Sequence, residues 1–298
     1  MIKSKSKKIL IFLVLLAIVI IPIATIPSCN TNRDNGINIV DDNYGTPKIN
    51  SVHVALGVPE DNDSTDDYDI IRSQYIISYN KDLGVANWVA WNLDADWYGD
   101  VPRYSGNFIA DTSLPSQFYK VKHSDYTNSG YDRGHMVRSE ERTKTDEDNK
   151  STFFLTNIIP QTPDLNQGVW LKLEYYCEDL CKQQNKELYV IAGGIYHTKE
   201  KIKGLVTIPD SCFKIIVVLN RNQGLKNIDI NSEVIAVVMP NISGVRSDDW
   251  MKYSTTVDRI EFSTGYDFLN CLPKKIQAII EAKQITNVAN LKHSNSWH

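Results

Sequence analysis

The segment from Tyr131 to His135 combines side-chain types that suit attack on a phosphodiester bond. The imidazole of His135 titrates near neutral pH, so it can accept a proton from water. Arg133 carries a permanent positive charge, and Gly134 allows the backbone to approach a ligand closely. A lone histidine is more often structural than catalytic, so this cluster alone does not decide the chemistry.

A second cluster follows further along the chain, where Asn166, Trp170 and Glu174 recur at spacings of four residues. If a helix begins near Asn166, this spacing places an amide oxygen, an indole and a carboxylate on one helix face, and a hard cation can bind at its start. The plainer interpretation makes Asn166 a helix N-cap and Glu174 an ordinary solvent-facing charge. The spacing alone leaves both interpretations open.

Taken together, the two clusters resemble the DNA/RNA non-specific endonucleases of the ββα-metal fold. The resemblance rests on three runs: Asp132-Arg133-Gly134-His135, Asn157-Ile158-Ile159-Pro160-Gln161, and Asn166-Gln167-Gly168 followed by Trp170 and Glu174. It covers roughly Val52 to Glu281. Further landmarks occur in the family's order, namely Arg103, Phe108, Asp111, Ala192 to Tyr196, Ile208-Pro209, Phe213-Lys214, Pro240-Asn241, Ile260-Glu261 and Thr264-Gly265.

The resemblance predicts an α+β fold, a ββα-metal nuclease domain with a central, mostly antiparallel sheet flanked by helices. It implies a metal-dependent endonuclease that hydrolyses phosphodiester bonds of DNA and RNA to 5′-phosphate ends. Because phosphate-centred chemistry reads neither a base edge nor a 2′-hydroxyl, single- and double-stranded substrates are both expected, with weak sequence preference.

The resemblance also implies a role for each matching residue. His135 would activate water as the general base with Arg133 beside it, and Asn166 would be the single protein ligand of a Mg²⁺ ion that keeps several waters. The remaining roles fall to Asn157, which would position phosphate or water, to Glu174, which would hold waters of the ion, and to Arg103, which would offset charge on the phosphorane. Whether Mn²⁺ replaces Mg²⁺ is left open by the sequence.

One position departs from the family pattern, which has proline three residues after the histidine where this chain has Arg138. Proline would stiffen the loop, whereas Arg138 is expected to add charge close to the scissile phosphate and to alter rate or preference. Arg138 and the N-terminal tether motivate an alternative function, a catalytically weak surface lipoprotein that binds extracellular nucleic acid. A toxin-like nuclease with an immunity partner fits less well, because the chain carries its own export signal and no large delivery region.

The charge of the chain argues against a passive nucleic-acid binder. Without the four lysines that precede Cys29, 28 of the 32 basic residues remain against 36 acidic ones, a net charge of −8 with histidine neutral. A protein held by many phosphate contacts should be basic. The balance fits an enzyme that touches a few phosphates at one site.

Residues 1–29 read as an export signal of the lipoprotein type. Four lysines form a basic start, Ile9 to Ile21 form an uninterrupted apolar run, and Ile26-Pro27-Ser28-Cys29 resembles a lipobox without its usual leucine. The alternative is an uncleaved N-terminal anchor, since Ile9 to Ile26 is about the minimum length for a membrane span. Both interpretations predict an exported, membrane-anchored protein on the periplasmic side or the cell surface.

The rest of the chain divides into a flexible tether over 30–51, a single endonuclease domain over 52–285 and a C-terminal tail over 286–298. Asn80 to Gly84 between two β-branched and aromatic runs is typical of a hairpin. The expected strands are Gln74 to Tyr79, Asn87 to Leu93, Phe153 to Thr156, Leu188 to Ala192, Phe213 to Leu219 and Val234 to Met239, and the expected helices are Gln167 to Gln184 and Pro273 to Lys283.

Four cysteines follow Cys29, namely Cys177, Cys181, Cys212 and Cys271. Outside the cytoplasm they allow up to two disulfides in three pairings. Cys177 and Cys181 share a helix face, so each is expected to face a distant partner or to stay a buried thiol. The spacing of these two cysteines without a nearby histidine is a weak zinc signal. Oligomeric state and biological role are not indicated by any of these patterns.

Overall fold

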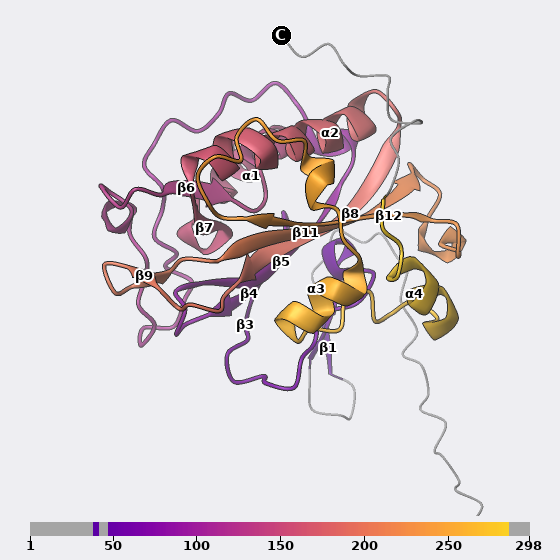
Figure 1. Ribbon diagram of the computed structural model, residues 1–298, viewed down its shortest axis with the longest axis horizontal. Coiled ribbons are helices and arrows are strands. Elements are labelled where there is room, and N and C mark those ends of the chain that lie inside the picture. Colours follow the sequence, from indigo (N-terminus) through magenta and orange to yellow (C-terminus); the bar gives the residue numbers. More distant parts are fainter. Residues whose placement is uncertain (1–37, 42–46, 286–298) are drawn as a thin grey trace, which may run out of the picture.

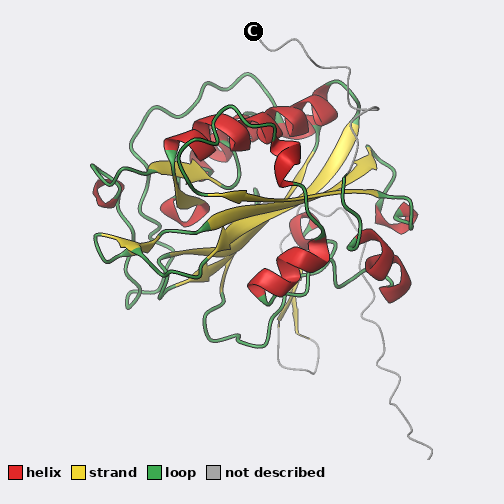
Figure 2. Ribbon diagram, in the orientation of Figure 1, coloured by secondary structure: helices red, strands yellow, loops and turns green. Residues whose placement is uncertain are grey.

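A six-stranded antiparallel sheet forms the centre of the chain (Figures 1 and 2), for which the computed structural model describes residues 38–41 and 47–285. The strand order is β12-β11-β8-β5-β4-β3, and every neighbouring pair is antiparallel. Its strands are β3 (Tyr68–Ile71), β4 (Ile76–Asn80), β5 (Val85–Leu93), β8 (Lys186–Ile195), β11 (Ser211–Asn220) and β12 (Glu233–Pro240).

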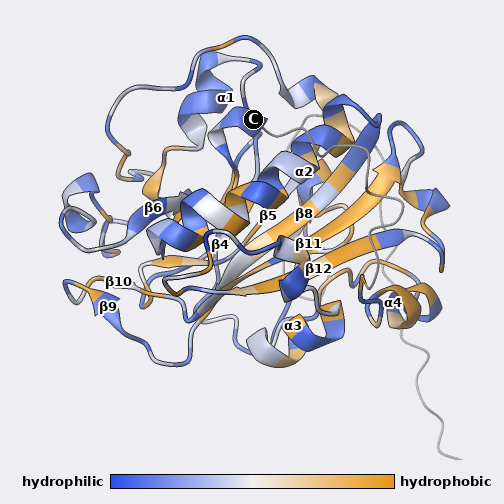
Figure 3. Ribbon diagram, turned by 45° about the horizontal axis from the view of Figure 1, so that its top comes forward, coloured by the Kyte–Doolittle hydropathy of each residue, from blue (hydrophilic) through white to orange (hydrophobic). Residues whose placement is uncertain are grey.

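Both faces of the central strands are apolar, because the sheet lies between two layers. In β11, Cys212, Ile216 and Val218 belong to one core cluster, and the alternating Phe213 and Ile215 belong to the other. Side chains alternate between the faces of a strand, so a sheet buried on both sides reads as a continuous apolar run. Figure 3 shows these hydrophobic strands between helices whose outer faces are hydrophilic.

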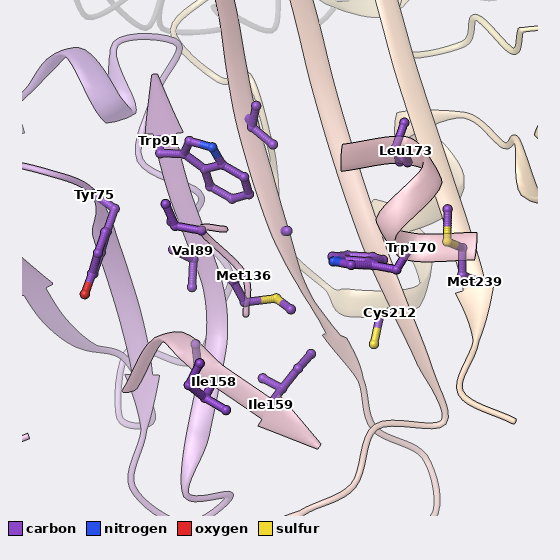
Figure 4. Packing of buried hydrophobic residues seen from close by; sticks show 14 of the residues in the cluster. Tyr75, Val89, Trp91, Met136, Ile158, Ile159, Trp170, Leu173, Cys212 and Met239 are labelled. Carbon is purple, nitrogen blue, oxygen red and sulfur yellow. The ribbon is translucent and has the colours of Figure 1, made fainter. Parts of the chain in front are cut away.

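The layer on one side of the sheet contains the longest helix and a small hairpin (Figure 1). These are α1 (Asp146–Ser151), α2 (Trp170–Lys182) and the antiparallel pair β6 (Asp132–His135) and β7 (Ile158–Gln161). Figure 4 shows Met136, Ile158 and Ile159 packed near Val89 of β5, with Trp170 lying further along the sheet toward Cys212. The motif that carries His135 is therefore fixed to the sheet through buried contacts.

Two shorter helices cover the opposite face of the sheet (Figure 1). They are α3 (Val257–Thr264) and α4 (Lys274–Ile280), and their apolar residues Val257, Ile260 and Ile280 are buried in the second core cluster. Thr256 caps α3 by accepting a hydrogen bond from the backbone of Arg259, and Gly265 ends it in the left-handed region. The remaining strands form two small pairs, β1 (Asn38–Asp41) with β2 (Pro47–Asn50), and β9 (Lys201–Ile202) with β10 (Val206–Thr207).

Most of the strands expected from the sequence are present, including the hairpin that turns at Asn80 to Gly84 between β4 and β5. The strand expected at Phe153 to Thr156 is wrong, because these residues form a turn whose backbone makes only a short bridge to Ile109. The short helix α3 was not expected at all. Part of the expected tether is paired as β1 and β2, where Ile49 is buried against the second core cluster.

The described cysteines form no disulfide with one another, and Cys177, Cys181 and Cys212 are buried thiols. Burial raises the pKa of Cys177 to about 12, which keeps this thiol protonated and unreactive. Within 38–41 and 47–285, no helix has the length and apolarity needed to cross a membrane. The expected signal over 1–29 and the tail over 286–298 lie outside the described residues.

Candidate active site

His135 ends strand β6 and faces Ile158 of β7 across the hairpin. Its ring packs against two phenylalanines that also contact each other, with centroid distances of 5.2 Å to Phe108 and 5.1 Å to Phe153. The Nε2 atom is buried without a hydrogen bond, and among the described residues none bonds to Nδ1, which is not buried. Nδ1 is therefore the ring nitrogen that is open to solvent.

The charge state of His135 follows from its surroundings. Burial, and then the positive charge of Arg103, lower the pKa of His135 to about 3. The imidazole is thus neutral at neutral pH, the form in which a ring nitrogen can accept a proton.

Gly134 is required by the close approach of the two hairpin strands. A Cβ atom at this position would lie 2.1 Å from Oε1 of Gln161, whose side chain fills the space beside the backbone. Gln161 is itself fully buried and cannot withdraw toward solvent. Any larger residue at 134 would therefore move β6 and, with it, the ring of His135.

Asn157 lies beneath the segment that follows His135 and is fully buried. Its Oδ1 accepts a hydrogen bond from the backbone of Val137 at 3.0 Å, and its Nδ2 donates to the carbonyls of Val137 and Thr152 at 3.0 and 2.9 Å. Both amide protons are therefore used. The expected contact of Asn157 with phosphate or water does not fit this arrangement, in which the side chain positions the backbone next to His135.

Arg103 and Arg133 have different partners near His135. The guanidinium of Arg103 lies 4.9 Å from the Phe153 ring and donates to Glu140 at 2.8 Å and to Ser139. The guanidinium of Arg133 lies 5.7 Å from the Phe108 ring, and its Nη2 donates to the carbonyl of His123 at 2.8 Å. Arg103, about half exposed, is thus the arginine nearer to the charged groups of the site.

Asn166 is joined to the same hairpin through Asp132, the first residue of β6. Its Nδ2 donates to Oδ2 of Asp132 at 2.9 Å, and Gln167 donates to the same oxygen at 2.7 Å. This bond turns the amide so that Oδ1 points elsewhere, and no described residue donates to that oxygen. An amide oxygen free of protein donors beside a carboxylate fits a hard divalent cation that keeps several waters.

The helix expected to begin near Asn166 starts at Trp170 instead. Residues Leu165–Val169 form a π-helical turn that is broken at Gly168, with φ −119° and ψ −108°. The backbone of Arg246 packs here, and a Cβ on Gly168 would lie 2.6 Å from its Cα. The prediction that Asn166, Trp170 and Glu174 share one helix face is therefore wrong for Asn166. Trp170 and Glu174 do share a buried face of α2.

Glu174 is buried between two positive charges rather than facing solvent. Its Oε2 lies 3.7 Å from Nε of Arg138, and its Oε1 lies 3.9 Å from Nζ of Lys214. Burial raises the pKa of Glu174 to about 7, although Lys214 and then Arg138 act to lower it. Lys214 is 1% exposed and points from β11 toward α2, where it also lies 4.2 Å from the Trp170 ring.

The sequence suggested that Arg138 lies close to the scissile phosphate, but its side chain is turned into the protein. It is buried, donates to Glu178 at 2.8 Å and lies 3.2 Å from Glu140 in addition to its contact with Glu174. Burial opposes its charge, but Glu174 and Glu140 raise the pKa of Arg138 above its ordinary value. The charge that motivated a nucleic-acid-binding lipoprotein is thus neutralised inside the protein.

A chain of alternating charges runs from Arg103 through Glu140, Arg138 and Glu174 to Lys214. His135 lies near the first members of this chain, and Asn166 is tied to β6 through Asp132. The sequence did not identify Asp132 as a support for Asn166, or Glu140 and Glu178 as partners of Arg138. Lys214 carried a signal, because it is the single charged residue within the apolar run from Phe213 to Leu219. A lysine at such a position is buried and needs a partner.

Comparison with known proteins shows which family this chain belongs to. The model of the DNA/RNA non-specific endonuclease family matches residues 55–275. The chain belongs to that family. The resemblance seen in the sequence is confirmed, and the chain is a nuclease of a family that depends on a divalent metal ion.

Several named relatives agree with this endonuclease assignment. A protein named Nuclease from Nostoc sp. is 46% identical over 243 residues, covering 80% of this chain and 87% of that protein. Nuclease C1 from Cunninghamella echinulata is 33% identical over 216 residues, covering 67% and 82%. Human mitochondrial endonuclease G is 26% identical over 211 residues, covering 66% and 68%.

A solved structure confirms the fold of the endonuclease. The crystal structure of the EndoG/EndoGI complex, whose title concerns the inhibition of EndoG, contains a chain that superposes with a TM-score of 0.65 at 25% identity. The match covers 78% of this chain and 96% of that one. The predicted α+β class with a central antiparallel sheet is therefore confirmed.

Proposed function

We propose that this endonuclease hydrolyses DNA and RNA with Mg²⁺, using His135 as the general base and Asn166 as the metal ligand. The observation that carries the proposal is that strand β6 ends in one of these groups and is hydrogen-bonded to the other. His135 ends β6 with Nδ1 open to solvent, and Asp132 at the start of the same strand orients the amide of Asn166, which lies in the turn before α2. A base and a cation ligand that are both fixed to one strand can act on the same phosphate.

His135 would take a proton from a water molecule at Nδ1 as that water attacks the phosphorus atom in line with the leaving 3′ oxygen. Its low pKa keeps the ring unprotonated until substrate arrives. The negative charge of a bound phosphate then favours the protonated ring, which raises the pKa of His135 toward the range useful for catalysis. The Phe108 and Phe153 rings fix the direction of the imidazole during this transfer.

Arg103 would offset the charge that develops on the phosphorane. Only its Nη1 donates to Ser139 and Glu140, so other N–H groups of the guanidinium can donate to phosphate oxygens. Arg133 lines an open pocket of about 520 Å³ together with His123 and Tyr126, which suits a contact to a neighbouring phosphate. The 5′-phosphate product follows from release of the 3′ oxygen.

Asn166 would hold the Mg²⁺ ion through Oδ1, and its side-chain orientation depends on Asp132. When bound, the ion supplies positive charge that polarises the phosphate and stabilises the leaving oxygen. Glu174 lies in the buried charge network behind this site and would order the waters of the ion. None of these groups reads a base edge or a 2′-hydroxyl, so both DNA and RNA are expected substrates.

The test uses the purified chain with supercoiled plasmid and with RNA, in Mg²⁺, in Mn²⁺ and in EDTA. Cutting of both substrates that EDTA abolishes, and that falls by about 10²–10⁴-fold in His135→Ala, is the expected result. Asn166→Ala should cut only when the Mg²⁺ concentration is raised. Full activity of His135→Ala with an intact fold would rule out the assigned base.

We also propose that the chain is exported and held at a membrane through its first 29 residues, as the basic start and apolar run indicate. Lipid attachment at Cys29 is favoured over an uncleaved anchor by the run Ile26-Pro27-Ser28-Cys29. Cell fractionation after feeding a labelled fatty acid tests this. Label in the parent and none in Cys29→Ala supports a lipoprotein, whereas unlabelled protein that stays in the membrane supports the anchor.

A further inference from the structure

Helices α3 and α4 lie on the face of the sheet opposite α2 and the β6–β7 pair (Figure 1). Three carboxylates from this region come together there. Asp258 and Glu261 are one turn apart on α3, and Glu281 directly follows α4. One carboxylate oxygen from each residue lies within 4.8 Å of the other two. Oxygens that bind one Ca²⁺ ion at about 2.3–2.6 Å are at most about 5 Å apart, so these three can share a single ion.

Glu281 is the unusual member of this cluster, because it is only 5% exposed and its Oε1 is buried without a hydrogen bond. One turn earlier in α4, Oε1 of the buried Gln277 is a second acceptor without a donor. Buried acceptors normally receive a hydrogen bond, since leaving one unpaired destabilises the fold. The two side chains lie one helical turn apart, and each keeps one acceptor that no described group serves, so a cation or a proton is needed beside them.

The surrounding side chains do not supply a cation. No ion pair within the described ranges involves Asp258, Glu261 or Glu281, and the nearby Lys274 pairs with Asp267 at 3.5 Å. A buried carboxylate among other carboxylates must gain either a proton or a cation.

We propose that Asp258, Glu261 and Glu281 bind a divalent cation of the calcium type, separate from the active site. A proton would neutralise Glu281 alone and leave the other two carboxylates repelling each other. A cation satisfies all three at once and fastens the end of α4 to α3. Ca²⁺ is favoured over Mg²⁺ because it accepts irregular oxygen ligand sets, and the exposed side of Asp258 gives the ion a path from solvent.

The test measures thermal unfolding of the full chain with and without Ca²⁺, in an Asn166→Ala background that removes the ligand proposed for the catalytic ion. We expect Ca²⁺ at a hundred times its dissociation constant to raise the melting temperature by about 5 °C or more. Glu281→Gln and the exposed Asp258→Asn should each abolish that rise. Calorimetric titration should show one Ca²⁺ site fewer in either variant.

Two results would overturn the proposal. A melting temperature that Ca²⁺ does not change, but that Glu281→Gln raises, would mean that Glu281 is simply protonated in the native protein. An equal rise in the parent and in both variants would place the cation elsewhere, for example at the half-buried group Asp61, Asp66 and Asp67. Nuclease activity of Glu281→Gln in the chain that keeps Asn166 serves as the fold control, because this substitution should leave it unchanged.

Discussion

Arg138 Nε lies 3.7 Å from Oε2 of Glu174, and this contact connects the loop after His135 to helix α2. The same guanidinium donates to Glu178 one turn further along the helix. Where the family pattern has a proline that stiffens the loop through its ring, this chain thus ties the loop to α2 by charge. The two solutions restrict the same segment by different physical means.

We expect Arg138→Met to destabilise the protein by about 3 kcal/mol, because it removes one of the two positive charges beside the buried Glu174 and leaves only Lys214 at 3.9 Å. Lys182→Met is the matched control, since Lys182 also pairs with Glu178, at 2.7 Å, but is 40% exposed. Such a surface pair contributes about 0–1 kcal/mol. Urea unfolding of both variants measures the difference, and equal losses would show that burial of the Arg138 charge network is unimportant.

Removing Asp132 should weaken metal binding without removing Asn166, the proposed metal ligand. Asp132 holds the amide of Asn166 by the 2.9 Å hydrogen bond, and supports of this kind are worth about 10–100-fold in metal affinity. Asp132→Ala is therefore expected to raise the Mg²⁺ concentration for half-maximal activity by that factor. Gln167→Ala removes the other donor to the same carboxylate and should change this Mg²⁺ concentration little. Similar effects of both substitutions would mean that Asp132 acts through the turn as a whole.

Asn157→Ala separates a positioning role from contact with substrate. The substitution removes three hydrogen bonds to buried backbone groups, so we expect a loss of about 3 kcal/mol in unfolding free energy. The fraction that stays folded should show a reduced kcat from misplacement of His135, with KM nearly unchanged. A raised KM together with unchanged stability would instead support the contact with phosphate that the family resemblance suggested.

The sequence predicted the central sheet and the nuclease family well, because both depend on local patterns. Short β-branched runs such as Phe213 to Leu219 favour strands buried on both faces, and the motifs that contain His135 and Asn166 are shared with a known family. The prediction of a strand at Phe153 to Thr156 was wrong, because its aromatic residues are typical of a strand but serve another purpose here. Phe153 in fact packs against His135, and the backbone turns to bring Asn157 beneath the site.

The partners of charged residues were beyond the reach of the sequence, since they come from distant segments. Arg138 was expected near the phosphate, but Glu174 and Glu178 are brought to it by a helix that begins thirty-odd residues later, with Lys214 arriving from β11. The kink at Gly168 likewise depends on the backbone of Arg246. Local spacing identified the chemical groups, and the tertiary packing determined which of them remain free to act.

Acid stability gives a prediction that is independent of catalysis and rests on His53. This residue is buried, its Nε2 lies 2.8 Å from the carbonyl of Ser73, and its Nδ1 accepts a hydrogen bond from the backbone of Asn92 at 3.0 Å. Burial, and then the charge of Arg142, lower the pKa of His53 to about 3. The unfolded chain protonates this ring near pH 6.5, whereas the native protein does not, so stability is present above that pH and is lost as the pH falls toward 3.

Between pH 7 and pH 5 this single group should cost about 2 kcal/mol of unfolding free energy. Glutamine offers one donor and one acceptor without titrating, so His53→Gln should show an acid-induced loss that is smaller by this amount. Urea unfolding of parent and variant at pH 8, 7 and 5 provides the measurement, and the difference between the two proteins should be constant from pH 8 to 7. A difference that is also constant down to pH 5 would mean that the native protein accepts a proton at His53, which contradicts its burial and its two backbone contacts.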